Sequence, residues 1–456
     1  MIRIPITDNS TRTLTDSELP AKSDIERIAD IEIANLQLDD NPNLLVFPQS
    51  LGYHGDDIGE GVIIELSDSK ISTNNIMGFV GVNQAQIDIR SRFASGKEDY
   101  FLHYMLQKVF SINLFKIEHT TTTEPIFDFL LYMFPHFLKK AVAQGVFKKY
   151  RRFEYNDANI RGPIDVSRHI RQNIPFRGTV AYSTRQHTYD NELTQLVRHT
   201  IEYIRTKAHG ASILNNDPET KNCVGQIVQA TPSYNVRERQ RVVNQNLRPV
   251  RHPYFSAYTE LQKICLQILR HESIKYGQEK DKIYGILFDG AWLWEEYLNT
   301  VLKECEFKHP KNKENRGGIK MFAVPSEEDF FDHNSRKFYP DFWLPNKDDK
   351  GPEKMAHFII DAKYKRLDKN GVGREDLYQV VTYMHCMKAA NGGFMYPTEN
   401  ESKTERYELA GYGGTMRIFG VKVQHGGSYD AYKIAMKEVE QNLQKQLKDI
   451  LNSSME

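Results

Sequence analysis

One apolar segment interrupted by charges at alternate positions constrains the fold of this chain more than any other feature. Phe358-Ile-Ile-Asp-Ala-Lys-Tyr-Lys365 begins as a buried β-strand, which Asp361 and Lys363 then interrupt. Side chains alternate between faces along a strand, so these two charges project to the same side. Charges in a central strand are costly unless they are paired or bound to a cation. The pattern predicts a charged site inside a sheet, although the solvated face of an edge strand is the alternative.

A further acidic residue precedes this strand. Residues 337–344 are predicted to form a strand of their own, and Pro340-Asp341 lies within it. Phosphodiester hydrolysis needs a divalent cation that polarises the phosphate and activates water. Mg²⁺ prefers carboxylate oxygens, so two aspartates on adjacent strands can share one ion. We therefore expect Asp341 and Asp361 to bind Mg²⁺ or Mn²⁺, and Lys363 to orient the attacking hydroxide or offset transition-state charge.

The helix predicted after this strand, at about 374–389, carries a polar pair. Gln379 and Tyr383 are four residues apart and therefore share one helical face. Ordinary helix packing explains such a pair when it stands alone. In this position, after an aspartate–lysine strand, the pair resembles the QxxxY element of a large branch of the PD-(D/E)xK nucleases, which implies that both side chains frame the catalytic site and the DNA strand.

An upstream acidic residue is expected on a helix between Phe288 and Glu304. At helical spacing, the apolar residues of this segment form one face, with Glu295 in its middle and Glu296 at its margin. A carboxylate inside an apolar face needs a partner, and a metal ion would supply one. We choose Glu295 as a third metal ligand. Pairing of one of these glutamates with a buried Arg or Lys is the alternative.

Changes in hydrophobic period divide the 456 residues into three regions. Residues 1–95 predict a β-rich domain after a polar start without strands. Residues 96–250 change to helical spacing and predict a mainly helical region. Residues 251–456 interleave helices with strands, which predicts an α/β sheet covered by helices. The expected fold is multidomain, of the α/β and α+β classes.

Some shorter segments of the middle region give local predictions. Pro135 should kink or split its helix. Residues 148–152 suggest a solvated turn, and residues 209–222 a connection rich in Asn, Asp, Pro and Gly. The arginines of residues 236–251 could contact phosphates or belong to a solvated linker.

Composition limits the class of protein. Lys+Arg and Asp+Glu number 60 each, so bulk charge does not favour a protein that coats nucleic acid. Four scattered cysteines form no CxxC zinc pair and fit a reducing compartment. The opening residues do not read as a secretory signal, and no apolar run is long enough to span a bilayer. We expect a cytoplasmic protein without a membrane partner.

These motifs together resemble a known family. The C-terminal half resembles the PD-(D/E)xK nucleases, on Tyr339-Pro-Asp341, Ile360-Asp-Ala-Lys-Tyr364 and the pair Gln379 and Tyr383. The whole chain resembles the McrC family, the nuclease subunits of McrBC-type modification-dependent restriction systems. Its further matches are Trp294-Glu-Glu-Tyr297, Gly145-Val-Phe-Lys-Lys-Tyr150, Ile160-Arg-Gly-Pro-Ile164 and Tyr189-Asp-Asn-Glu-Leu193.

The resemblance implies a restriction-endonuclease-like domain over 251–456 and a protein partner. McrC-like proteins act with McrB, an AAA+ GTPase that forms a ring and recognises modified DNA. The N-terminal part of McrC-like chains docks on that ring and stimulates GTP hydrolysis, so residues 96–250 are expected to be the partner-docking region. The chain has no GxxxxGK[ST] loop, which agrees with a subunit that does not hydrolyse the nucleotide. The expected substrate is double-stranded DNA, methylated or unmodified.

Three functions remain open from the sequence. The leading one is the endonuclease subunit of a restriction system that defends against phage and other foreign DNA. The second is a stand-alone DNA-repair nuclease of the same fold. The third is a non-catalytic adaptor that activates a GTPase, against which the intact Asp341, Asp361 and Lys363 count. Fold alone does not decide among them.

Overall fold

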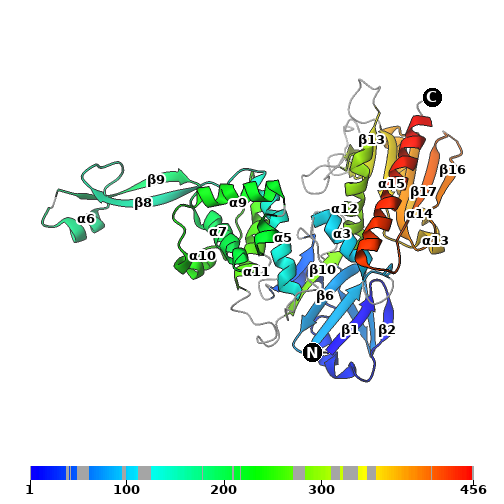
Figure 1. Cartoon of the computed structure of the whole chain (residues 1–456), viewed down its shortest axis with the longest axis horizontal. Helices are drawn as coiled ribbons and strands as arrows, with labels where there is room; N and C mark the ends of the chain where they lie inside the picture. Colours follow the sequence, from blue (N-terminus) through cyan, green and yellow to red (C-terminus); the bar gives the residue numbers. More distant parts are fainter. Residues whose placement is uncertain are drawn as a thin grey trace, which may run out of the picture. The chain divides into compact units, whose positions relative to one another are not determined.

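The structure, a computed structural model, forms two compact units. One comprises Met1–Lys116 together with Tyr276–Glu456, and the other comprises Ile117–Lys275 (Figure 1). The residues it describes are 2–36, 41, 43–48, 61–94, 99–110, 125–176, 178–207, 210–215, 217–270, 283–309, 319–321, 337–346, 356–411 and 413–453. None of the described helices is long and apolar enough to cross a membrane.

The N-terminal part of the first unit is β-rich, as predicted. A five-stranded sheet has the order β1 (Ile2–Thr7), β7 (Ala85–Arg90), β6 (Ile76–Val82), β10 (Ile283–Asp289) and β3 (Asn43–Phe47). A three-stranded sheet of β2 (Thr11–Thr13), β5 (Lys70–Thr73) and β4 (Ile64–Ser67) and the short helices α1 (Lys22–Ile25) and α2 (Ile33–Leu36) accompany it. The prediction that the first 30 residues hold no strand is wrong. Pro5 is accommodated because β1 is an edge strand, paired only with β7.

The two units do not divide at the predicted boundaries near 95 and 250, and strand β10 explains the difference. It lies between β6 and β3, pairing antiparallel with the first and parallel with the second. Its residues come after the whole second unit in the sequence. The N-terminal sheet is therefore completed by a strand from the C-terminal half, and the two halves pack as one unit.

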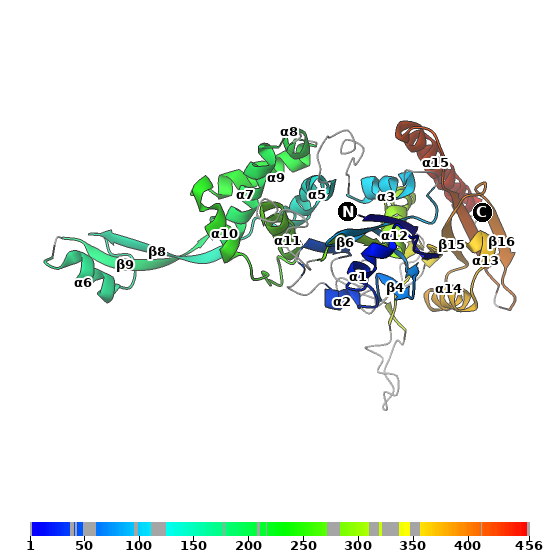
Figure 2. The same cartoon turned by 90° about the horizontal axis from the view of Figure 1, so that it is seen from below.

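The C-terminal sheet carries the charged strand. Its order is β13 (Phe342–Pro345), β14 (Ala356–Ala362), β15 (Asn391–Thr398), β17 (Thr415–Lys422) and β16 (Thr404–Glu408). Figure 2 shows α14 (Arg374–Met387) and α15 (Tyr429–Ser453) on opposite sides of it. The first unit also contains α3 (Tyr100–Phe110), α12 (Gly290–Leu302), α13 (Leu367–Asn370), β11 (Ile319–Lys320) and β12 (Lys337–Phe338). The mixed α/β class is as predicted.

The segment 337–344 is not one strand, contrary to the prediction. β12 pairs with β11, whereas β13 pairs with β14. Tyr339, Pro340 and Asp341 lie between them, outside any strand. Proline cannot donate to a strand ladder, which accounts for the break. Asp341 therefore lies just before β13 rather than within it.

The second unit combines helices with a long β-hairpin. The helices are α5 (Pro125–Val142), α7 (Glu192–Arg205), α8 (Gly210–Leu214), α9 (Pro218–Ala230), α10 (Arg239–Gln245) and α11 (Ala257–Arg270). α5 runs through Pro135 without splitting, so of the two predicted outcomes, a kink or a split, the split is wrong. Residues 209–222 contain helical segments, so the prediction of a plain connection is also wrong. The mainly helical character is as predicted.

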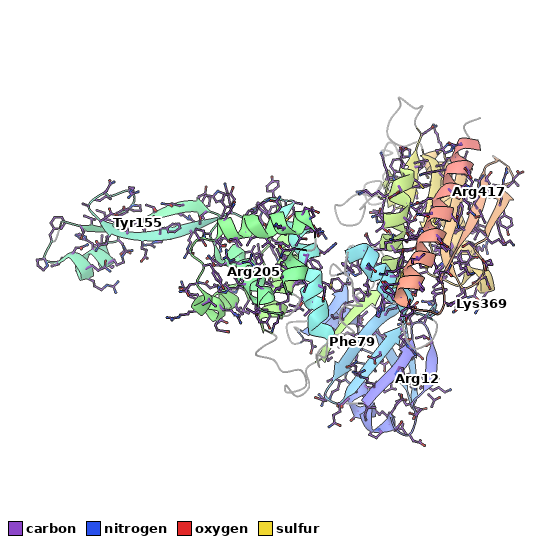
Figure 3. All side chains as sticks on the ribbon, in the orientation of Figure 1. Arg12, Phe79, Tyr155, Arg205, Lys369 and Arg417 are labelled. Carbon is purple, nitrogen blue, oxygen red and sulfur yellow. The ribbon has the colours of Figure 1, made fainter. Side chains whose placement is uncertain are left out.

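The hairpin consists of β8 (Lys149–Asp157) and β9 (Val180–Thr188), paired antiparallel over their whole length, with α6 (Val166–Asn173) at the far end. Figure 3 labels Tyr155 on it, whose ring stacks on that of Tyr182 at 5.4 Å. Residues 148–152, predicted as a turn, therefore lead into a strand. The expected solvent exposure of this segment is nevertheless largely correct.

Candidate active site

Strand β14 brings the charged side chains onto the face covered by α14. Ile359 belongs to the apolar cluster that includes Val380 and Met384 of α14. Because side chains alternate along a strand, Asp361 projects to the same face as Ile359. Lys363 follows the strand end, where its backbone N–H still donates to the carbonyl of Met395 on β15. β14 is central, between β13 and β15, so the solvated edge-strand alternative is excluded.

The ammonium group of Lys363 is held by three acceptors. Its Nζ atom lies 2.7 Å from Asp361 Oδ2, 3.1 Å from Gln379 Oε1 and 3.4 Å from Asp376 Oδ1. The contact with Gln379 is a hydrogen bond, and those with the two aspartates are ion pairs. Burial alone would lower the pKa of Lys363, but the charges of Asp361, Asp341 and Asp376 raise it above its ordinary value. The lysine therefore remains charged at neutral pH.

The predicted helical pair belongs to the same network. Gln379 Nε2 donates to the hydroxyl of Tyr383 at 2.8 Å, while Gln379 Oε1 accepts from Lys363. The Tyr383 ring stacks on Phe338 of β12 with 5.4 Å between centroids. Burial raises the pKa of Tyr383 to about 12, so its hydroxyl keeps its proton. The structure thus links Gln379 and Tyr383 directly to the lysine of the strand motif.

The two aspartates lie close enough to affect each other. Asp341 Oδ2 accepts from the backbone N–H of Ala362 at 2.8 Å, beside Asp361 in the sequence. Asp361 is 1% exposed. Burial, and then the charge of Asp341, raise its pKa to about 8 against the opposing pull of Lys363. The charges of the two neighbouring carboxylates, one of which is fully buried, repel each other. A divalent cation would relieve this repulsion.

The donor set fits a hard divalent cation. Asp361 Oδ2 forms an ion pair with Lys363 but no well-aligned hydrogen bond among the described residues. Mg²⁺ is typically held by one or two carboxylates plus waters and substrate phosphates. In the described part of the chain, no three His, Cys, Asp or Glu side chains come together as a metal site. Asp341 and Asp361 nevertheless supply two carboxylates, the ligand type and number that Mg²⁺ commonly takes from a protein.

Helix α12 does not present Glu295 as predicted. Phe288 lies in β10, and α12 begins at Gly290 with Asp289 as its N-cap. The buried positions include Leu293, Trp294, Tyr297 and Leu298, whereas Glu295 and Glu296 are exposed to similar extents, 26% and 27% of their side chains. Glu295 is therefore not in the middle of the buried face. Its role as a metal ligand remains a prediction.

Two residues of this site had no assigned role in the sequence. Asp376, in the first turn of α14, pairs with both Lys363 and Lys365. An acidic residue in the first turn of a helix can be recognised from the sequence, but it does not by itself indicate a functional site. His309 lies 3.7 Å from both Glu295 Oε1 and Glu296 Oε1, and its Nδ1 atom is 2.8 Å from the carbonyl oxygen of Asp341. No sequence pattern around His309 pointed to this contact.

Electrostatics keep the His309 ring protonated. Burial alone would lower the pKa of His309, but the nearby carboxylates of Glu296 and Glu295 outweigh burial and raise it to about 9. A histidine is therefore one partner of the two glutamates of α12 among the described residues.

Two of the solved structures to which this chain is similar come from Thermococcus gammatolerans. The refined half-complex from a tetradecameric assembly of Thermococcus gammatolerans McrB AAA+ hexamers with bound McrC has 15% sequence identity and a TM-score of 0.47, covering 98% of this chain and 100% of that chain. The cryo-EM structure of the Thermococcus gammatolerans McrBC complex has 14% identity and a TM-score of 0.33, covering 66% of this chain and 87% of that chain.

The sequence itself matches one family over most of its length. No curated protein matches the chain significantly. The family described as McrBC 5-methylcytosine restriction system component matches residues 71–397, which is well over half of the chain. The matched stretch includes the strand motif, the helical pair and the hairpin. The chain therefore belongs to the McrBC 5-methylcytosine restriction system component family.

Proposed function

We propose that this chain is the McrC-type endonuclease subunit of a McrBC-like restriction system. It would cleave DNA by metal-dependent phosphodiester hydrolysis when an AAA+ GTPase partner activates it. The observation that carries the nuclease assignment is the Lys363 ammonium 2.7 Å from the buried Asp361 carboxylate, with Asp341 hydrogen-bonded to the next residue of the same strand. Family membership supports the restriction system.

Asp341 and Asp361 would hold the divalent cation, which supplies charge to polarise the phosphate and to activate water. The Ala362 N–H fixes one oxygen of Asp341, so that carboxylate is oriented before any ion arrives. Lys363 is charged, and its ammonium group lies beside the oxygens of Asp361, Gln379 and Asp376. It is therefore suited to offsetting negative charge on the phosphate and unsuited to taking a proton from water.

Gln379 and Tyr383 would orient Lys363 and frame the DNA strand. The amide of Gln379 joins the Tyr383 hydroxyl to the Lys363 ammonium, so one helical turn of α14 fixes the lysine. Tyr383 is itself held by its stacking on Phe338. A lysine held in this way loses little conformational entropy when a phosphate arrives, which favours the transition state.

The β8–β9 hairpin is the proposed docking element of residues 96–250. Two-stranded hairpins are marginally stable unless they pack against something, and this one exposes apolar side chains at its far end. They are Ile160, Ile164, Val166, Ile170, Ile174 and Phe176. Clustered exposed apolar residues mark protein interaction sites. We assign them to the AAA+ GTPase partner.

Hydrogen bonds and an ion pair hold the far end of the hairpin in its conformation and leave the apolar side chains there exposed. Arg168 of α6 donates to the carbonyl of Tyr155 at 2.6 Å and pairs with Glu154 at 2.9 Å. Asn173 is bonded to Asn156 and Thr179. The polar side chains thus fix α6 on the strands, and the apolar ones remain available to a partner.

The test is a plasmid cleavage assay with Mg²⁺ and GTP, with and without an AAA+ protein encoded beside this chain. Methylated and unmethylated plasmids are compared. Cleavage only with partner and GTP is the expected result, and dependence on methylation would decide the subtype. Cleavage by this chain alone would replace the proposal with a stand-alone nuclease. Stimulated GTP hydrolysis without any cleavage would replace it with an adaptor.

A further inference from the structure

Asp341 is held at both ends although it lies outside the sheet. Its carboxylate oxygen Oδ2 accepts from Ala362, as described above. Its main-chain carbonyl precedes the ladder between β13 and β14, whose first pair is Phe342 with Ile360. A partly buried carbonyl needs a hydrogen-bond donor. That donor is the imidazole of His309, whose Nδ1 atom lies 2.8 Å away.

The backbone around His309 delivers the ring to this place. Lys308 and Trp343 exchange two backbone hydrogen bonds, of 2.8 and 3.0 Å. The Lys308 ammonium lies over the Trp343 ring, 4.8 Å from its centroid. The ring of His309 stacks on that of Phe342 with 4.9 Å between centroids and an interplanar angle of 29°. The backbone of Lys308 is thus fixed beside Trp343 of β13, and the ring of His309 is fixed beside that of Phe342.

The two nitrogens of the ring have different tasks. A carbonyl oxygen only accepts hydrogen bonds, so Nδ1 of His309 carries a proton, and this N–H donates a hydrogen bond to the main-chain carbonyl oxygen of Asp341. The other nitrogen, Nε2, faces Glu296 at 3.7 Å. Glu295 is also 3.7 Å from Nδ1. The imidazole therefore connects the carboxylates of α12 to the main chain of Asp341.

We propose that His309 is a positioning residue, which holds the main chain of Asp341 through Nδ1 so that its carboxylate meets the divalent cation. This inference rests on the proposed function and deepens it. Groups that orient a metal ligand typically change metal affinity by about 10- to 100-fold when they are removed. We therefore expect substitution of His309 to weaken binding of the ion more than it destabilises the fold.

Two substitutions separate the nitrogens. His309→Asn places an amide N–H near the position of Nδ1, and His309→Gln places one near that of Nε2. The full-length chain and both variants are titrated with Mn²⁺ in the absence of DNA, and the free ion is measured by electron paramagnetic resonance. Circular dichroism and thermal melting establish that each variant is folded. This readout does not depend on cleavage.

The proposal predicts that His309→Asn binds Mn²⁺ within about threefold of the unmodified chain, whereas His309→Gln binds about tenfold or more weakly. Equal affinities in the two folded variants, whether strong or weak, would overturn the inference and leave the proposed function standing. Absence of Mn²⁺ binding by the unmodified chain would overturn the metal site itself, and with it the role of His309.

Discussion

The carboxylate of Asp341 accepts a hydrogen bond from the backbone N–H of Ala362 at 2.8 Å. This contact joins the two separated parts of the PD and DxK motif, because Ala362 is the middle residue of the triplet. It also places the charge of Asp341 where it raises the pKa of Asp361. The arrangement brings two carboxylates together at the end of β14 before a cation is present, and this has consequences for stability and for metal binding.

Neutralising Asp361 should stabilise the metal-free protein. The folded-state pKa of this carboxyl lies above its ordinary value of 3.8, so its contribution to stability falls as pH rises from about 4 to about 8. We expect Asp361→Asn to raise the melting temperature in EDTA at pH 8.5, by an amount equivalent to at least about 2 kcal/mol. The increase should shrink towards pH 5, and Mg²⁺ should no longer raise the melting temperature.

Asp376 provides the control of opposite sign for this experiment. Hydrogen bonding by Lys365 and the charge of Lys363 outweigh burial and lower the pKa of Asp376. Its charge therefore stabilises the fold above its unfolded pKa, and Asp376→Asn should lower the melting temperature at pH 8.5. If both substitutions shifted the melting temperature in the same direction, the electrostatic account of this cluster would be wrong.

Metal binding should depend on pH through the same carboxyl. The raised pKa of Asp361 increasingly favours its protonated form as pH falls below about 8, and the cation then has to displace a proton. We expect the apparent affinity for Mg²⁺ to increase at least about tenfold from pH 6.5 to pH 8.5 and then to level off. Isothermal titration calorimetry in buffers of different ionisation enthalpy would also count the released proton. A flat profile over this range would contradict a raised pKa at the metal site.

The exposed apolar side chains at the far end of the hairpin should affect only the interaction with the partner. Ile174 is 65% exposed there, and Ile434 on α15 is 62% exposed. Ile174→Asp should weaken binding of the AAA+ partner and its stimulated GTP hydrolysis about tenfold or more, because a buried interface would then desolvate a charge. Ile434→Asp is the matched control and should leave both unchanged. Equal effects of the two substitutions on GTP hydrolysis would remove the hairpin from the docking surface.

Much of the site was predictable because its residues are local in sequence. The alternation in Phe358–Lys365 predicted β14 and placed Asp361 and Lys363 near one another. The spacing of Gln379 and Tyr383 predicted their common face on α14. Membership of the McrBC family, inferred from these motifs, is confirmed by the family match. Short-range periodicity carries information of this kind without any knowledge of tertiary contacts.

Long-range pairing was not predictable in the same way. A helix is predicted from Phe288 onward, because Phe288 and the following residues continue an apolar pattern, although Phe288 and Asp289 are the last two residues of β10. The rest of β10 is not predicted to be a strand. Its partners β3 and β6 lie more than 190 residues away in the sequence. This error also misplaced the buried face of α12, and so the position of Glu295. The contact of His309 with Asp341 depends on the bridge between Lys308 and Trp343, which no local pattern encodes.

The most direct test compares two neighbouring lysines of the same motif. Lys363 contacts Asp361, whereas Lys365, two residues on, is largely exposed and pairs with Asp376. Plasmid cleavage with Mg²⁺, GTP and the partner is measured for Lys363→Ala and Lys365→Ala, with circular dichroism to establish native helix content. We expect Lys363→Ala to lose about 100-fold or more of the cleavage rate, while Lys365→Ala stays within a few-fold of the unmodified chain. Unchanged cleavage by folded Lys363→Ala would contradict the assignment of this site.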